Sequence, residues 1–206
     1  MILLTKYIWE SSVRHHAKSP GWLLSWLGAL VIASVFTGIA HATQRKEHRT
    51  GIIASPDDKL RAVMIALEPN NDYGNEESRV EIRDGTGKLL SVKDFSSSDS
   101  NHGGLVVDTE WTADSKFFVF SLESSGGHQP WQSPVWFYSR SDRKFREIYD
   151  LLGGRPVLQL DAPPFQIVEP DSVKVTTWTR PGLGEKDNVT VVVNLAAPRP
   201  SAYPTP

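Results

Sequence analysis

Residues 110–120 read Glu-Trp-Thr-Ala-Asp-Ser-Lys-Phe-Phe-Val-Phe, which is a polar turn followed by an apolar run. Asp and Ser favour turns because their side chains hydrogen-bond to nearby backbone, whereas aromatic and β-branched residues favour strands. Comparable runs recur after residue 50, each bounded by clusters of Gly, Pro, Asn, Asp and Ser, and helical periodicity is nearly absent. The sequence therefore predicts an all-β domain.

The predicted strands are short, and most are rich in Val, Ile, Phe, Trp and Thr. They are Leu60–Leu67, Arg79–Arg83, Leu89–Phe95, Leu105–Trp111, Phe117–Leu122, Val135–Ser139, Phe145–Leu151, Val157–Leu160, Phe165–Val168, Val173–Thr179 and Val189–Leu195.

The turn in residues 112–116 belongs to an internal repeat. Related turns at residues 55–59 and 169–174 each precede an apolar strand, and their second positions, Pro56, Ala113 and Pro170, are spaced 57 residues apart. Equal spacing of similar units is typical of stacked repeats. We therefore expect repeated antiparallel hairpin units near residues 55–111, 112–168 and 169–195, which together form a β-repeat domain over residues 54–195.

This pattern resembles the blade repeat of TolB-type and related β-propellers. In those blades a strand ends in Trp, a [Ser/Thr]-Pro-Asp-Gly-Lys turn follows, and a hairpin closes with an Asp-Gly turn; residues 110–120 and 82–89 carry the likeness. The resemblance implies about two and a half blades, whereas a closed propeller needs about four to eight. Three arrangements stay open: an incomplete propeller-like stack, a propeller completed by self-association, and a small β-sandwich. Open edges of such a stack favour a dimer or a partner.

The N-terminal region predicts export. Residues 21–40 carry no charge, three basic residues precede them, and Ala40-His41-Ala42 follows as an A-x-A pattern. This arrangement is typical of a signal peptide cut after Ala42, while about 20 apolar residues also suffice for an uncleaved helical membrane anchor. We expect residues 1–42 to be one or the other, with the β domain outside, in the periplasm or extracellular space. Residues 43–53 are interpreted as a linker and residues 196–206, rich in Pro, as a disordered tail.

Composition excludes several kinds of partner and chemistry. The chain has 22 Lys and Arg against 24 Asp and Glu, so it lacks the basic excess that nucleic-acid binding requires. It has no cysteine, which excludes disulfides, thiolate metal sites and a cysteine nucleophile. No G-x-S-x-G, H-E-x-x-H or phosphate-binding glycine loop is present. No catalytic residue, metal ligand or cofactor is predicted, and the repeat aspartates Asp57, Asp114 and Asp171 are interpreted as turn residues.

One loop is a candidate contact surface. Residues 124–131 combine flexible glycines with His128 and Trp131, and Trp136 follows closely. Aromatic side chains on loops supply a large rigid contact area for carbohydrate or protein recognition, so these three residues are the candidate ligand or partner contacts. In the alternative interpretation, Trp131 fills the edge of the core and His128 caps a turn.

These features lead to three functional hypotheses. The first is a non-catalytic, exported or membrane-tethered β-repeat domain that binds a protein or an envelope component. The second is a hydrolase with an unrecognised site around His128, Asp114 and a serine at the top of a repeat. The third is a structural subunit whose open blades complete the β-sheet of a partner.

Overall fold

The computed structural model describes residues 46–69, 72, 74–161, 163–168, 170–179 and 188–198. The hydrophobic segment 21–40, the pattern at residues 40–42 and most of the Pro-rich tail lie outside these ranges. Within the described ranges, no helix has the length and apolar character that a membrane span requires.

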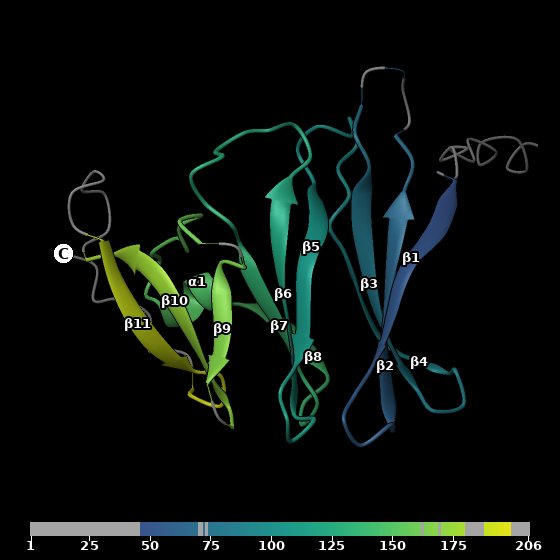
Figure 1. The fold of residues 1–206 in the computed structure, drawn as a ribbon. Coiled ribbons are helices and arrows are strands. Elements are labelled where there is room, and N and C mark those ends of the chain that lie inside the picture. Colours follow the sequence, from purple (N-terminus) through teal and green to yellow (C-terminus); the bar gives the residue numbers. More distant parts are fainter. Residues whose placement is uncertain are drawn as a thin grey trace, which may run out of the picture. The chain divides into compact units, whose positions relative to one another are not determined.

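The described chain is mainly β-structure, in three antiparallel sheets (Figure 1), which confirms the all-β prediction. The first sheet has the order β1-β2-β3-β4, with β1 Glu47–Ala54, β2 Leu60–Leu67, β3 Glu77–Asp84 and β4 Leu89–Asp94. The second has the order β5-β6-β7-β8, with β5 Gly104–Trp111, β6 Phe117–Ser124, β7 Val135–Ser139 and β8 Lys144–Glu147. The third has the order β11-β10-β9, with β9 Phe165–Val168, β10 Ser172–Trp178 and β11 Asn188–Asn194.

Each sheet begins one strand earlier than the sequence repeat. β1, β5 and β9 precede the three repeat turns, so β5 opens the second sheet instead of ending the first unit. β1 occupies residues that the sequence analysis assigned to a linker. Its first four residues are polar and exposed, and an edge strand that pairs only with β2 needs no continuous apolar pattern.

Two predicted strands differ in the structure. The run at residues 145–151 leaves the strand at Glu147 and forms the short helix α1, Ile148–Leu151, whose Ile148 is buried. The run at residues 157–160 makes only isolated bridges, from Val157 to Thr177 and from Leu158 to Gln132. In these runs the buried apolar residues Ile148 and Val157 cover the hydrophobic core beside β9, β10 and β11, a role for which strand pairing is not required.

The first two repeat turns have the same hydrogen bonds. The Ser55 hydroxyl donates to the Asp57 carboxylate at 2.7 Å and accepts the Leu60 N–H at 3.0 Å. Thr112 makes the equivalent bonds to Asp114, at 2.8 Å, and from Phe117, at 3.0 Å. The position after the aspartate has positive φ in both turns, 54° at Asp58 and 62° at Ser115. This is where the blade motif has Gly, the residue that adopts positive φ without strain.

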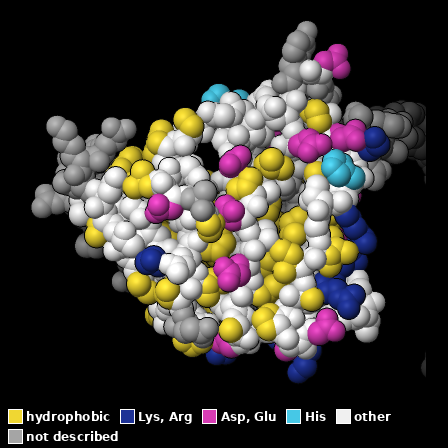
Figure 2. Space-filling view, in the orientation of Figure 1, with side chains coloured by type: hydrophobic (Ala, Val, Ile, Leu, Met, Phe, Trp, Pro, Cys, Tyr) yellow, Lys and Arg dark blue, Asp and Glu magenta, His cyan; other side chains and the backbone are white. Residues whose placement is uncertain are grey.

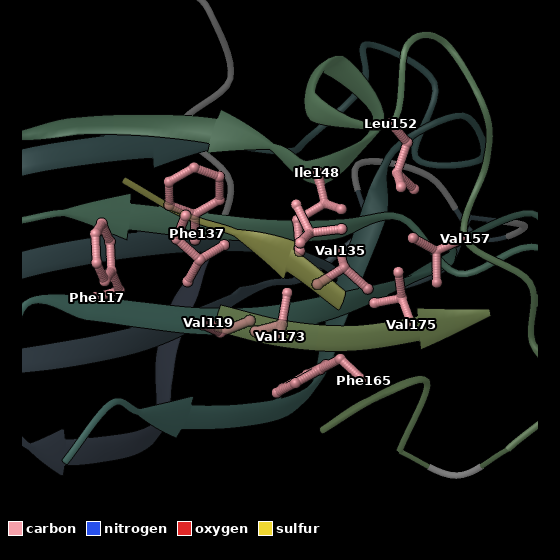
Figure 3. Packing of buried hydrophobic residues seen from close by; sticks show 12 residues of the cluster. Phe117, Val119, Val135, Phe137, Ile148, Leu152, Val157, Phe165, Val173 and Val175 are labelled. Atoms are coloured by element: carbon pink, nitrogen blue, oxygen red, sulfur yellow. The ribbon is translucent and has the colours of Figure 1, made fainter. Parts of the chain in front are cut away.

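Two hydrophobic cores lie on opposite faces of the second sheet. Phe118 and Phe120 on β6 pack with the first sheet in the first core. Phe117 and Val119, which alternate with them, pack with β9, β10 and β11 in the second core (Figure 3). Because successive strand residues point to opposite faces, a strand covered on both faces is continuously apolar. This explains the aromatic run that marks the repeat.

Candidate functional site

A pocket of about 370 Å³ opens where the loops at one end of the first two sheets meet, and Figure 2 shows histidine and acidic side chains at this end. Its apolar part is formed by Phe95, Leu122, Pro134 and Trp136. Its polar part is formed by His102, Glu123, His128, Gln129, Gln132 and Glu147. The pocket is therefore amphipathic, with most of its polar groups able to accept hydrogen bonds.

The two histidines of the pocket stack on each other. Their ring centroids lie 4.9 Å apart with an interplanar angle of 12°. The Nδ1 atom of His102 lies 2.5 Å from the Asp99 carboxylate, and the His128 backbone N–H donates to the Ser124 hydroxyl at 3.2 Å. Hydrogen bonds from the backbone N–H of Asn101, from Ser97 and from His102 lower the pKa of Asp99 to about 2. The ionised Asp99 therefore orients His102, and His102 supports His128.

The loop that carries His102 is anchored by Glu77, a fully buried carboxylate on β3. Its Oε1 accepts the Gly103 N–H at 2.8 Å and the hydroxyls of Ser97 and Ser125 at 2.6 and 2.9 Å. Its Oε2 accepts the Ser97 N–H at 2.8 Å. Ser125 belongs to the loop after β6, so this cluster ties the His102 loop of the first sheet to the His128 loop of the second.

Gly103 is required at this cluster. A Cβ atom at this position would lie 2.4 Å from both the Glu77 carboxylate and the Phe95 carbonyl oxygen, closer than real contacts allow. The glycine therefore lets the backbone approach the buried carboxylate closely enough to donate its N–H.

The aromatic wall of the pocket comes from both sheets. Phe95 packs edge-on against Trp136 with centroids 5.2 Å apart. The ammonium of Lys93 lies 4.8 Å from the Trp136 ring centroid and 5.7 Å from that of Phe95, within the range of a cation–π interaction. A cation is thus already accommodated over this aromatic surface.

Glu147, the last residue of β8, lines the same pocket. Burial and the nearby charge of Asp150 raise the pKa of Glu147 to about 7, and the positive charge of Lys93 opposes this rise. A carboxyl with this pKa is part protonated near neutrality, so it can accept or donate a hydrogen bond to a ligand.

The structure separates the three candidate residues of the sequence analysis. His128 and Trp136 line the pocket together. Trp131 does not line it; its ring stacks on Trp178 of β10 with centroids 5.1 Å apart at 20°, and 43% of the residue stays exposed. Trp131 therefore connects the loop after β6 to the third sheet and does not contribute to the pocket.

Sequence reasoning did not identify Phe95 and Glu147 as pocket residues. Phe95 follows β4 and Glu147 ends β8, so only the packing of the two sheets brings them together. No local pattern marks either residue, and nothing in the sequence links His102 to His128.

The turn aspartates have the role expected from the sequence in the first two turns. Asp57 and Asp114 accept the backbone N–H groups of Lys59 and Lys116 at 3.2 and 3.0 Å. The Asp57 carboxylate also accepts a hydrogen bond from the Arg140 guanidinium of the second sheet at 2.7 Å. This bond, together with the one from the Ser55 hydroxyl, holds the pKa of Asp57 well below its usual range.

Asp114 and His128 do not form a joint site. Asp114 lies in the turn before β6 and His128 in the loop after it, and an eight-residue strand is about 25 Å long. Among the residues that the structure describes, no group of three or more His, Cys, Asp or Glu side chains could hold a metal ion.

Comparison with models of known protein families and with curated proteins finds no significant match to this chain.

Proposed function

We propose that this chain is an exported or membrane-tethered β-repeat protein that binds a protein or an envelope component through the pocket between its first two sheets, without a chemical step. The observation that carries the proposal is the convergence of the His102–His128 stack, Trp136 and Glu147 on one open pocket. These groups come from three separate segments, and the buried Glu77 cluster holds the two loops that carry His102 and His128, so this part of the pocket is formed before a ligand arrives.

The pocket chemistry favours a ligand group that donates hydrogen bonds and carries positive charge. Glu123, Glu147, Gln129 and Gln132 offer acceptor oxygens beside an aromatic wall. Lys93 over Trp136 shows that this aromatic surface holds an ammonium, which the basic group of a ligand would displace. The expected ligand group is therefore the basic side chain of a partner protein or an amine of an envelope component.

In this proposal the three sheets are consecutive blades of an open, propeller-like stack. Each blade starts with a strand that precedes the repeat turn, and successive blades pack face to face through the two cores. A two-layer sandwich accounts less well for the second sheet, whose two faces are both covered. The open stack also leaves the structural-subunit hypothesis as a second candidate, favoured by the terminal edges at β1 and β11.

Export rests on the sequence of residues 1–42, with its uncharged stretch 21–40 and the residues Ala40 and Ala42. N-terminal sequencing of the protein from its native host tests this part. Thr43 at the N-terminus indicates cleavage and release, whereas an intact N-terminal region in the membrane fraction indicates an anchor. Recovery of the intact chain from the cytosol contradicts both.

Binding is tested with the full-length chain and two end-blocked tripeptides, one with a central Arg and one with a central Glu. Tryptophan fluorescence should show saturable binding of the Arg peptide, at least fivefold tighter than that of the Glu peptide. Glu147→Gln and His128→Ala should each weaken the Arg peptide at least fivefold, while Glu110→Gln, on β5 outside this pocket, should not. Equal binding by all variants contradicts the site, and conversion of either peptide that is lost in His128→Ala contradicts the non-catalytic proposal.

A further inference from the structure

Strand β11 forms a terminal edge of the third sheet, next to β10. Residues 188–194 read Asn-Val-Thr-Val-Val-Val-Asn, without a charge, a Pro or a Gly. The strand pairs with β10 over its whole length without a register shift. Natural edge strands usually carry Lys, Pro or a bulge that prevents pairing with another chain, and β11 has none of these.

The hydrogen bonds around β10 show which backbone groups of β11 point outward. The Leu195 N–H donates to the Asp171 carbonyl at 2.8 Å, and on the other side of β10 the Leu158 N–H donates to the Thr176 carbonyl at 2.8 Å. Because antiparallel ladders alternate, the odd-numbered residues of β11 bond to β10 and the even-numbered ones face away. The backbone N–H and C=O groups of Thr190 and Val192 therefore lie along the free edge, without a strand partner in the described part of the chain.

The strand is nearly the same read from either end. An antiparallel pair of two copies centred on Val191 would place Asn188 opposite Asn194, Val189 opposite Val193 and Thr190 opposite Val192. In this register the outward groups of Thr190 and Val192 bond to each other across the twofold axis, while Val191 faces its own copy in a non-hydrogen-bonded pair. The pattern of free groups and the symmetry of the sequence agree on one register.

The side chains along this edge also fit a second copy. Val193 is buried in the second core and Val191 packs against it. Beside them is a hollow of about 250 Å³ whose walls include Val191, Val193, Leu151 and Leu152. Antiparallel partners project onto the same face, so the valines of a second copy would enter this hollow. On the other face, Val192 is 63% exposed, the largest exposed fraction among the described large hydrophobic residues.

We propose that two copies of this chain pair antiparallel through β11, centred on Val191, and join their third sheets into one six-stranded sheet. A twofold contact of this kind closes on itself, so association stops at a dimer. The proposal is independent of the ligand pocket, which lies between the other two sheets.

The chain has no cysteine, so one introduced cysteine reports on this contact without background. In Val191→Cys, the two Cα atoms of a non-hydrogen-bonded pair would be about 4.5 Å apart, within the roughly 4.4–6.8 Å that a disulfide spans. Ile52→Cys on β1 is the matched control, because Ile52 is 55% exposed on the terminal strand of the first sheet. Mild oxidation of the full-length chains should give disulfide-linked dimers at least tenfold faster in Val191→Cys. Equal rates overturn the proposal.

A second variant separates pairing from folding. The Val192 N–H faces outward, so Val192→Pro removes no bond to β10, and proline is tolerated on edge strands. Added to Val191→Cys, it should slow dimer cross-linking at least tenfold. Unchanged cross-linking overturns the proposal, and so does a wild-type chain whose mass measured by light scattering, after subtraction of bound detergent, is that of a monomer at micromolar concentration.

Discussion

Glu77→Gln changes a single atom in the buried cluster that joins the first two sheets. Glu77 is 0% exposed, and the hydrogen bonds that its carboxylate accepts include two from backbone N–H groups and two from serine hydroxyls. Glutamine replaces one acceptor oxygen with an NH₂ group. The least costly orientation places this NH₂ at the Oε2 position, opposite the Ser97 N–H, while Oε1 keeps its three donors.

The expected cost follows from this geometry. One buried N–H loses its acceptor, which costs about 1–3 kcal/mol. Three charge-assisted bonds become neutral bonds of about half the strength, and the lower desolvation cost of an amide offsets part of this loss. We expect Glu77→Gln to lower the free energy of unfolding by about 2–4 kcal/mol.

Urea unfolding of the full-length chain, followed by tryptophan fluorescence at pH 7, measures this change. With a slope of about 2 kcal/mol per M, the midpoint should fall by about 1–2 M. Glu76→Gln is the control. The neighbouring Glu76 side chain is 49% exposed and its carboxylate lies 3.9 Å from the His48 ring, so the loss of its charge should cost less than about 0.5 kcal/mol. Equal urea midpoints for the two variants would show that the Glu77 carboxylate does not stabilise the loops of the pocket.

Three other substitutions give distinct outcomes. Asp58→Gly relieves a positive φ of 54° and should stabilise the chain by about 0.5–1 kcal/mol in thermal unfolding; a loss of stability would show that the Asp58 side chain contributes more than its backbone strain. Phe120→Ala removes a fully buried ring between the first two sheets and should cost about 3–5 kcal/mol in urea, so a cost below about 1 kcal/mol would contradict the first core. The raised pKa of Glu147, about 7, means that the folded chain keeps a proton which the unfolded chain releases near pH 4.5, so stability falls as the pH rises through this window. Glu147→Gln should therefore raise the melting temperature at pH 8 and change it little at pH 4, and the same shift at both values would be inconsistent with the raised pKa.

The fold could be predicted where local chemistry decides it. The turn at Asp114 and the aromatic run from Phe117 to Phe120 specify a turn and a strand buried on both faces, and both are present. β1 could not be predicted, because its polar first half gains its strand conformation only from pairing with β2. The end of β8 at Glu147 could not be predicted either, because no Gly or Pro lies in residues 145–151, where the strand ends and α1 begins.

The site was less predictable than the fold. His128 and Trp136 lie in one segment and were found together. Glu147 and Phe95 reach the pocket only through the packing of two sheets, and the same packing brings Ser125 to Glu77. Trp131 lies only five residues before Trp136 and was selected with it as an aromatic contact residue. Only the position of Trp178 shows that Trp131 contacts the third sheet instead. Local sequence therefore identified the loop, whereas tertiary contacts determine which of its residues share a surface.

Binding of a basic group in the pocket with the stacked His102 and His128 rings can be followed by imidazole NMR. The full-length chain, with its six histidines ¹³C-labelled, is titrated with the blocked Arg tripeptide. If the pocket binds the basic group, the signals of His102 and His128 shift together and saturate, while those of the other four histidines stay in place. Unchanged signals for both rings, or shifts confined to His48 and the histidines before it, would show that the pocket does not bind this group.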